Sequence, residues 1–309
     1  MSGYLDHGVW RRGWYDTSAS AGEFRRTEAA FRARVQADSR ARFPAAAGRY
    51  HLYVSRACPW AHRTLILRRL KQLEDVVSAD VVEPLMGDDG WAFAPGADSV
   101  NGFAFLREAY VAADPHYSGR VTVPVLWDRQ TRTIVNNESA EIIRMLNSAF
   151  EAFTDEHTDY YPQALRPEID AVNDYVYERV NNGVYRCGFA GSQAAYEQAF
   201  DTLFDALETL EARLGRSHFL VGERLTEADW RLFTTLVRFD PAYYLHFKCN
   251  LKRIADYPNL TRYLRALLAV PGVSATVDLD HIKRHYYQSH RHLNPSGLVP
   301  KGPRLDWVP

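Results

Sequence analysis

Cysteine is scarce in this 309-residue chain, and long apolar runs are missing from it. The three cysteines, Cys58, Cys187 and Cys249, are spaced neither as a disulfide framework nor as zinc-binding pairs. No apolar run approaches the roughly 20 residues that a membrane helix requires. The start of the chain also lacks the apolar segment of a signal peptide. We therefore expect a cytoplasmic protein with reduced thiols and no membrane partner.

An excess of charge of either sign is also absent. The formal net charge is −1, so there is no general basic field to attract nucleic acid. No glycine-rich phosphate loop is present, and we expect no nucleotide cofactor. The late histidines His285, His290 and His292 fit no standard zinc spacing, so we expect no metal. The arginine-rich stretch 25–34 is interpreted as a solvated helix face, and Cys187 and Cys249 as packing residues.

The length of the chain favours two domains, because 309 residues are more than a single small domain usually contains. Residues 1–48 form an extension in which a helix is expected over 28–41. Strand and helix patterns alternate over 49–150. Only helical spacing of apolar residues is found over 163–290, and the proline-rich tail 291–309 is expected to be irregular.

The order of elements in the first domain predicts its fold. The predicted elements are, in order, a strand Tyr50–Ser55, a helix Ala61–Leu73, a strand Val76–Val82, a hairpin of Val121–Trp127 with Thr133–Val135, and a helix Glu138–Leu146. This β-α-β then β-β-α order is the thioredoxin-like arrangement, with a long insertion between about Met86 and Gly119. The expected fold class is thus α/β followed by all-α. In the helical half, Thr226 and Asp229 form a variant of the capping box.

The stretch Cys58-Pro59-Trp60-Ala61 stands where the first strand meets the first helix. Unpaired N–H groups and the helix dipole at such a junction favour the thiolate, which is the nucleophilic form of sulfur. Pro59 is compatible with the first helical turn. Ala61 occupies the position of a second cysteine, so one-thiol chemistry that needs an outside thiol is predicted. A buried structural thiol is the weaker interpretation.

Two further local patterns point to ligand binding. Val123-Pro124 precedes a strand and is predicted to contain a cis peptide bond, which would leave the Val123 backbone exposed for pairing. Glu138-Ser139 opens a helix, where an anion can bind. An ordinary helix cap is an equally good interpretation of Glu138-Ser139 from the residues alone.

Several longer blocks resemble one family. These blocks are Cys58–Arg63, Arg120–Trp127, Asn137–Ser139, Phe219–Asp229, Arg238–Asp240, His246–Asn250 and His281–Tyr287. Together they resemble the glutathionyl-hydroquinone reductases, the xi class of cysteine-type glutathione transferases. The resemblance covers nearly the whole chain and implies a helical glutathione-transferase domain after the thioredoxin-like one.

The resemblance implies a reaction and partners. Cys58 would attack the glutathione sulfur of an S-glutathionyl-hydroquinone, release the hydroquinone and form a mixed disulfide. A second glutathione, acting as co-substrate, would resolve that disulfide to oxidised glutathione. The family also implies a homodimer.

The resemblance further assigns roles to individual residues. The glutathione contacts that it implies are Trp91, Arg120, Val121, Thr122, Val123, Glu138 and Ser139. Tyr185 would transfer a proton, while Tyr243 and Tyr286 would stabilise the Cys58 thiolate. A shift by one residue, to Tyr244 or Tyr287, stays open. Without the resemblance, Trp91 is as well interpreted as a packing anchor, and the tyrosines as partly buried aromatic residues.

Two other functions remain open at this point. A general cysteine-type glutathione transferase with thioltransferase or dehydroascorbate reductase activity would share Cys58, Val123 and Glu138-Ser139, but would not require the three tyrosines. A non-enzymatic, glutathione-binding regulatory protein is the second alternative. The presence of Cys58 at the strand-to-helix junction argues against it.

Overall fold

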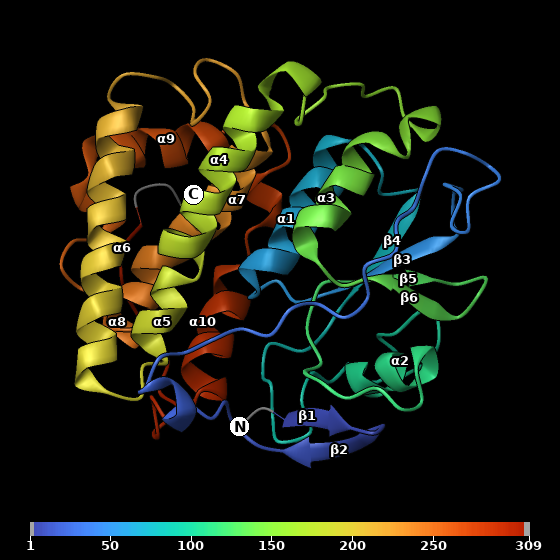
Figure 1. Ribbon diagram of the computed structural model, residues 1–309, viewed down its shortest axis with the longest axis horizontal. Coiled ribbons are helices and arrows are strands. Elements are labelled where there is room, and N and C mark those ends of the chain that lie inside the picture. The colour runs from blue at the N-terminus through green and yellow to red at the C-terminus, as the bar shows by residue number, and fades with distance from the viewer. Residues whose placement is uncertain (1–2, 306–309) are drawn as a thin grey trace. The chain divides into compact units, whose positions relative to one another are not determined.

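The computed structural model describes residues 3–305 and divides into two compact units that alternate along the chain (Figure 1). Within these limits, the first unit comprises 3–14, 27–158 and 275–298. The second unit comprises 15–26, 159–274 and the remaining tail. Residues 1–2 of the predicted extension and residues 306–309 of the predicted tail, with Pro309, lie outside the described residues.

The first unit contains a four-stranded sheet in the order β4-β3-β5-β6. Strand β3 (Tyr50–Val54) runs parallel to β4 (Val77–Val81) and antiparallel to β5 (Val125–Asp128), which pairs antiparallel with β6 (Thr133–Asn136). All five residues of β3 are buried, because helices and neighbouring strands cover it. The thioredoxin-like prediction is confirmed, although β5 begins at Val125 and not at residue 121.

Helices flank this sheet. Those of the first unit are α1 (Pro59–Leu70), α2 (Leu106–Ala113), α3 (Ser139–Ser148) and α10 (Leu279–Ser289). Helices α1 and α3 lie side by side, and α2, which belongs to the predicted insertion, packs against β6 (Figure 1). The predicted helix Ala61–Leu73 is confirmed with shifted bounds: α1 begins at Pro59, because Cys58 caps it and proline is tolerated in the first turn, and it ends at Leu70.

The helix predicted over residues 28–41 is wrong. This stretch contains no helix; it is extended or turning, with isolated bridges from Arg32 to Asn136 and from Gln36 to Pro44. Pairing with distant segments replaces the hydrogen bonds that a helix would have made. A short antiparallel hairpin, β1 (Gly3–Asp6) and β2 (Val9–Arg12), precedes it and was not predicted.

The second unit is helical, as predicted. Its helices are α4 (Arg166–Val176), α5 (Gly183–Gly188), α6 (Gln193–Leu214), α7 (Glu227–Arg238), α8 (Tyr244–His246) and α9 (Pro258–Leu268). The capping box at the start of α7 is confirmed, since the Thr226 N–H donates to the Asp229 carboxylate at 2.8 Å. Two π-helical segments, Tyr177–Asn181 and Phe239–Tyr243, lead into α5 and α8.

Helix α10 groups with the sheet, although the sequence places it at the end of the helical range 163–290. Hydrogen bonds account for this. The Ser55 hydroxyl lies 3.3 Å from the His281 imidazole, and the His62 imidazole lies 2.7 Å from the Thr276 hydroxyl. The compact units therefore do not follow the predicted ranges 1–48, 49–150, 163–290 and 291–309 one to one, and those ranges stay a prediction.

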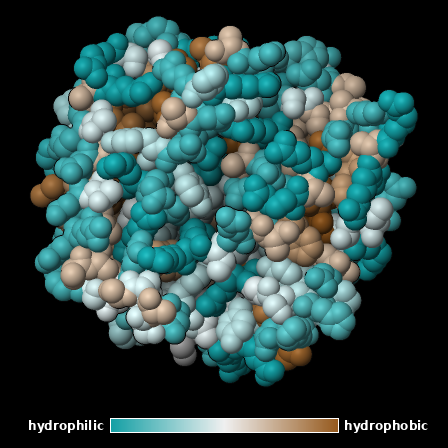
Figure 2. Space-filling view, in the orientation of Figure 1, coloured by the Kyte–Doolittle hydropathy of each residue, from teal (hydrophilic) through white to brown (hydrophobic). Residues whose placement is uncertain are grey.

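The visible face in Figure 2 is covered mainly by hydrophilic residues, with hydrophobic ones in small patches. The large apolar side chains that are exposed are Tyr4, Val9, Leu85, Phe153, Leu245, Leu251 and Leu298. Among residues 3–305, no helix combines the length and the apolar character needed to cross a membrane.

Candidate active site

The thiol of Cys58 lies at the amino end of α1. Its sulfur accepts a hydrogen bond from the Ala61 N–H at 3.5 Å, and its S–H donates to the Val123 carbonyl at 3.4 Å. The residue is half-buried, whereas Cys187 and Cys249 are buried. Cys58 is thus the one cysteine that combines access with a helix N-terminus, which is the setting of a reactive thiol.

The backbone of Val123 lies beside the Cys58 thiol. The Val123-Pro124 peptide bond is cis, as predicted. In the part of the chain that the structure describes, the Val123 N–H donates to no acceptor. A main-chain donor beside a nucleophilic sulfur can pair with an extended peptide, which is the role predicted for Val123.

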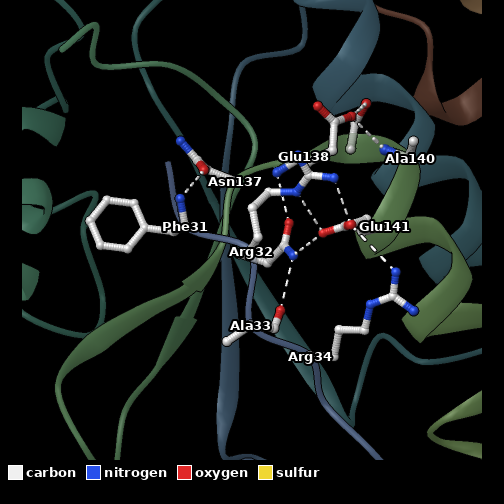
Figure 3. A network of polar contacts seen from close by, with 10 residues as sticks. Phe31, Arg32, Ala33, Arg34, Asn137, Glu138, Ala140 and Glu141 are labelled. Atoms are coloured by element: carbon white, nitrogen blue, oxygen red, sulfur yellow. Dashed lines mark hydrogen bonds and ion pairs between the residues drawn. The ribbon is translucent and has the colours of Figure 1, made fainter. Parts of the chain in front are cut away.

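Polar groups also gather at the first turn of α3 (Figure 3). Glu138 caps the helix, and its carboxylate accepts from the Ala140 N–H at 2.9 Å. The Ser139 hydroxyl accepts from the buried Arg63 guanidinium at 3.3 Å. No acceptor for the Ser139 N–H is found among residues 3–305. A free N–H at a helix N-terminus suits a carboxylate ligand.

The phenol of Tyr110 connects these two regions. It donates to the Thr122 carbonyl at 2.8 Å and accepts from the Asn137 side-chain amide at 3.2 Å. Burial raises the pKa of Tyr110, so the phenol stays neutral. Thr122 and its buried neighbour Val121 are therefore held in register with the start of α3.

Of the other implied glutathione contacts, Trp91 packs against α10 and Arg120 binds the N-terminal backbone. The Trp91 indole is buried and stacks on the His285 imidazole of α10, with ring centroids 4.9 Å apart. The Arg120 guanidinium donates to the backbone carbonyls of Gly13 and Trp14 at 2.7 and 2.9 Å. It therefore anchors the segment that follows the N-terminal hairpin, and its implied contact with glutathione stays a prediction.

Tyr286 belongs to the same unit as Cys58. Its side chain is buried, and its ring contacts the imidazoles of His285 and His290. Helix α10 is tied to the residues just before Cys58 by Ser55–His281 and by an ion pair of 3.2 Å between Arg56 and Asp278. These contacts fix the helix that carries Tyr286.

Tyr185 and Tyr243 are neighbours within the second unit. Their ring centroids are 5.9 Å apart, and both rings pack against Phe247. The Arg26 guanidinium lies 5.0 Å from the Tyr185 ring centroid. Tyr243 ends a π-helical segment, a local structure that is frequent at functional sites. Tyr244 is less buried, which favours Tyr243 as the residue of interest.

Three residues that pack around the candidate site were given no role in it from the sequence: Arg63, Tyr110 and His285. Arg63 ends the block Cys58–Arg63 that carries the resemblance, and this is the signal that could have found it. Tyr110 and His285 carry no local signal, because their partners are distant in sequence. Residues 3–305 contain no cluster of three or more His, Cys, Asp or Glu side chains arranged to hold a metal ion.

Known proteins match this chain over nearly its whole length. The family described as "Glutathione S-transferase, N-terminal domain" matches residues 57–149, and that described as "Glutathione S-transferase, C-terminal domain" matches residues 193–266. Glutathionyl-hydroquinone reductase PcpF of Sphingobium chlorophenolicum is 55% identical over 97% of this chain and 96% of its own length. Glutathionyl-hydroquinone reductase YqjG of Escherichia coli is 53% identical over 98% of this chain and 96% of its own.

Solved structures agree with these matches. The glutathione-bound structure of YqjG superposes with a TM-score of 0.90 at 50% identity, covering 99% of this chain and 97% of that one. A Xi-class glutathione transferase from Natrialba magadii has a TM-score of 0.92 at 47% identity, covering 100% of this chain and 95% of that one. The likeness therefore extends over both units.

Proposed function

The chain belongs to the glutathionyl-hydroquinone reductases, the Xi class of the glutathione transferases, and we propose that it reduces S-glutathionyl-hydroquinones to hydroquinones with glutathione. In this reaction one aryl thioether and one glutathione are converted to one hydroquinone and one oxidised glutathione. The substrate is reduced at the ring carbon, and two glutathione sulfurs are oxidised to a disulfide.

Cys58 performs the first half of the reaction. Direct cleavage of an aryl C–S bond would expel an aryl carbanion, so the ring first tautomerises to a ketone: the hydroxyl on the neighbouring carbon loses its proton, and the carbon that carries sulfur gains one. The Cys58 thiolate then attacks the glutathione sulfur, the S–C bond breaks, and its electron pair leaves as an enolate. Protonation of the enolate gives the hydroquinone. We assign the proton transfer to the ring carbon to Tyr185.

A second glutathione completes the cycle. Its thiolate attacks the glutathione sulfur of the mixed disulfide, and Cys58 leaves as thiolate. Tyr243 and Tyr286 are assigned to stabilise that thiolate by donating hydrogen bonds. Glutathione is held, in this proposal, by the Val123 backbone, Glu138 and Ser139, with Trp91, Val121 and Thr122 beside them.

One observation carries the proposal. The single accessible thiol, Cys58, lies 3.4 Å from the Val123 carbonyl, and the Val123 N–H beside it has no partner among the described residues. This is the arrangement that a cysteinyl peptide such as glutathione needs in order to bring its own sulfur to the nucleophile. The Ser139 N–H, which has no acceptor among residues 3–305, supports the same binding mode for a terminal carboxylate.

The proposal is tested by product balance. Purified protein is incubated with a panel of glutathionylated hydroquinones and glutathione, and free hydroquinone and oxidised glutathione are quantified by chromatography. We expect one of each per substrate consumed. Glutathione-dependent exchange on a simple mixed disulfide without any hydroquinone release would instead favour a general thioltransferase.

We further propose a cytoplasmic homodimer that binds neither nucleic acid nor membrane. The family supports the dimer, and the net charge of −1 supports the absence of nucleic-acid binding. Sedimentation should give twice the chain mass of 35.3 kDa. A monomer at micromolar concentration would contradict the first part of this proposal.

A further inference from the structure

The N-terminal extension runs along the start of α3 (Figure 3). The Phe31 N–H donates to the Asn137 side-chain oxygen at 3.0 Å, and the Asn137 N–H donates to the Phe31 carbonyl at 3.1 Å. The Asn136 amide donates to the Ala33 carbonyl at 2.9 Å. The extended segment 31–34 is therefore hydrogen-bonded to the turn that precedes Glu138 and Ser139.

Arg32 of this segment forms a two-pronged ion pair with Glu141 of α3. Its Nε lies 2.9 Å from one carboxylate oxygen, and its Nη2 lies 2.7 Å from the other. Arg34 lies 3.4 Å from the same carboxylate, but its side chain is 63% exposed, against 47% for Arg32. The geometry of Arg32 is the stronger of the two, because planar guanidinium groups bind carboxylates best with two parallel hydrogen bonds.

Glu141 lies in the first turn of α3. Its N–H donates to the Glu138 carbonyl at 3.1 Å, and its side chain is only 15% exposed. Burial would raise the pKa of Glu141, but hydrogen bonds from Arg32 and Asn136 lower it to about 2. The carboxylate is therefore ionised at neutral pH, in the same turn as the Ser139 N–H, for which the described residues supply no acceptor.

A negative charge at this point opposes binding of an anion. A helix N-terminus attracts a carboxylate, but Glu141, together with Glu138, makes the same turn acidic. Glu138 has a partner in the proposed complex, namely the ammonium group of glutathione. Glu141 has none there, so its charge must be offset by the protein itself.

We propose that Arg32 is a positioning residue for glutathione, which neutralises Glu141 and so allows the first turn of α3 to accept the γ-glutamyl carboxylate. This inference rests on the proposed function, and it replaces the interpretation of the arginine-rich stretch as a solvated helix face. Arg32 acts through Glu141 and does not contact the reacting atoms.

The test compares glutathione affinity by calorimetry and steady-state constants in matched variants. Arg32→Ala should weaken glutathione binding and raise its KM about fivefold, the size expected for one partly exposed ion pair, with kcat within about twofold. The effect should shrink in about 0.5 M salt. Arg40→Ala is the control, since Arg40 lies in the same extension and its ion pair is with the nearby Asp38 and not with α3.

Removal of the Glu141 charge distinguishes two roles of Arg32: neutralising Glu141, or only attaching the segment 31–34 to α3. Arg32→Ala combined with Glu141→Gln should restore glutathione affinity to near that of the wild type, and Glu141→Gln alone should bind at least as tightly as the wild type. This single variant keeps the test informative if Arg32→Ala folds poorly. An unrestored double variant, or an unchanged affinity in Arg32→Ala, would overturn the inference while leaving the proposed function intact. Failure of wild-type protein to bind glutathione would overturn both.

Discussion

The indole of Trp91 and the imidazole of His285 lie face to face, with centroids 4.9 Å apart and 19° between the ring planes. The same imidazole donates through Nδ1 to the Pro84 carbonyl at 2.9 Å. One turn later on α10, the Ser289 hydroxyl accepts from the Met86 N–H at 3.0 Å. Helix α10 therefore holds the insertion at three points and fixes the orientation of Trp91.

This contact predicts a role for His285 in glutathione binding. His285→Ala removes the stacking partner of Trp91, and we expect KM for glutathione to rise roughly twofold to tenfold, the size of one aromatic pair. The KM of His285→Phe, which keeps a ring, should lie between the values of His285→Ala and the wild type. KM is measured by steady-state kinetics, and glutathione binding is measured by quenching of tryptophan fluorescence. The exposed His116 provides the control His116→Ala; a lower kcat with unchanged KM would contradict the prediction.

Cys58→Ser should abolish turnover and leave glutathione binding largely intact, because serine keeps the shape of the site and loses the nucleophile. In the wild type, mass spectrometry after addition of substrate alone should reveal one glutathionyl group on Cys58. The buried Cys187 supplies a control, since Cys187→Ala should keep this adduct. An adduct on another cysteine, or full activity in the serine variant, would disprove the mechanism.

Tyr185→Phe should separate the aryl reaction from simple thiol exchange. Because only the aryl substrate needs a proton on its ring carbon, we expect kcat to fall at least about a hundredfold on a glutathionyl-hydroquinone. Exchange on a plain mixed disulfide should be nearly unchanged. Tyr244→Phe, next to the proposed Tyr243, is the control and should affect neither reaction. Equal losses on both substrates would favour the general transferase.

The buried His51 of β3 predicts a pH dependence of stability. Burial lowers the pKa of His51 to about 4, although Asp80, 3.2 Å away, opposes this shift. The unfolded chain takes up the proton near the usual value of 6.5, so protons favour unfolding between these two values. The free energy of unfolding should therefore fall as the pH is lowered from about 6.5 to about 4, by up to about 1.4 kcal/mol per pH unit.

Urea unfolding at pH 7 and at pH 5 measures this loss. In His51→Gln the difference between the two pH values should be smaller, since the uncharged amide cannot take up the proton. His116→Gln, at an exposed position, should behave as the wild type. The same pH dependence in all three proteins would show that His51 does not control it.

Local patterns were sufficient to predict the first strand of the sheet and the position of Cys58 at the start of the first helix. The alternation of Tyr50–Ser55 and the helical spacing after Pro59 depend only on residues close in sequence, and both elements are confirmed. The junction at Cys58 follows directly from those two predictions. The capping box at Thr226 was visible for the same reason, because its partner Asp229 is three residues away.

The extension could not be predicted in this way. Residues 28–41 have a composition compatible with a helix, yet Arg32 pairs with Glu141, which lies 109 positions further along the chain. Likewise His285 and Trp91 meet only because α10 returns to the sheet unit. No periodicity within either segment indicates its partner.

The sequence by itself thus determined the strands of the four-stranded sheet, the position of Cys58 at a strand-to-helix junction and the family, since each is encoded in neighbouring residues or in contiguous blocks. The tertiary structure alone decided which distant groups meet: the Cys58 thiol with the Val123 carbonyl, the Tyr110 phenol with Thr122 and Asn137, and Arg32 with Glu141. The physical reason is that hydrogen bonds and ion pairs between distant segments depend on proximity in space. That proximity arises only when the whole unit is packed.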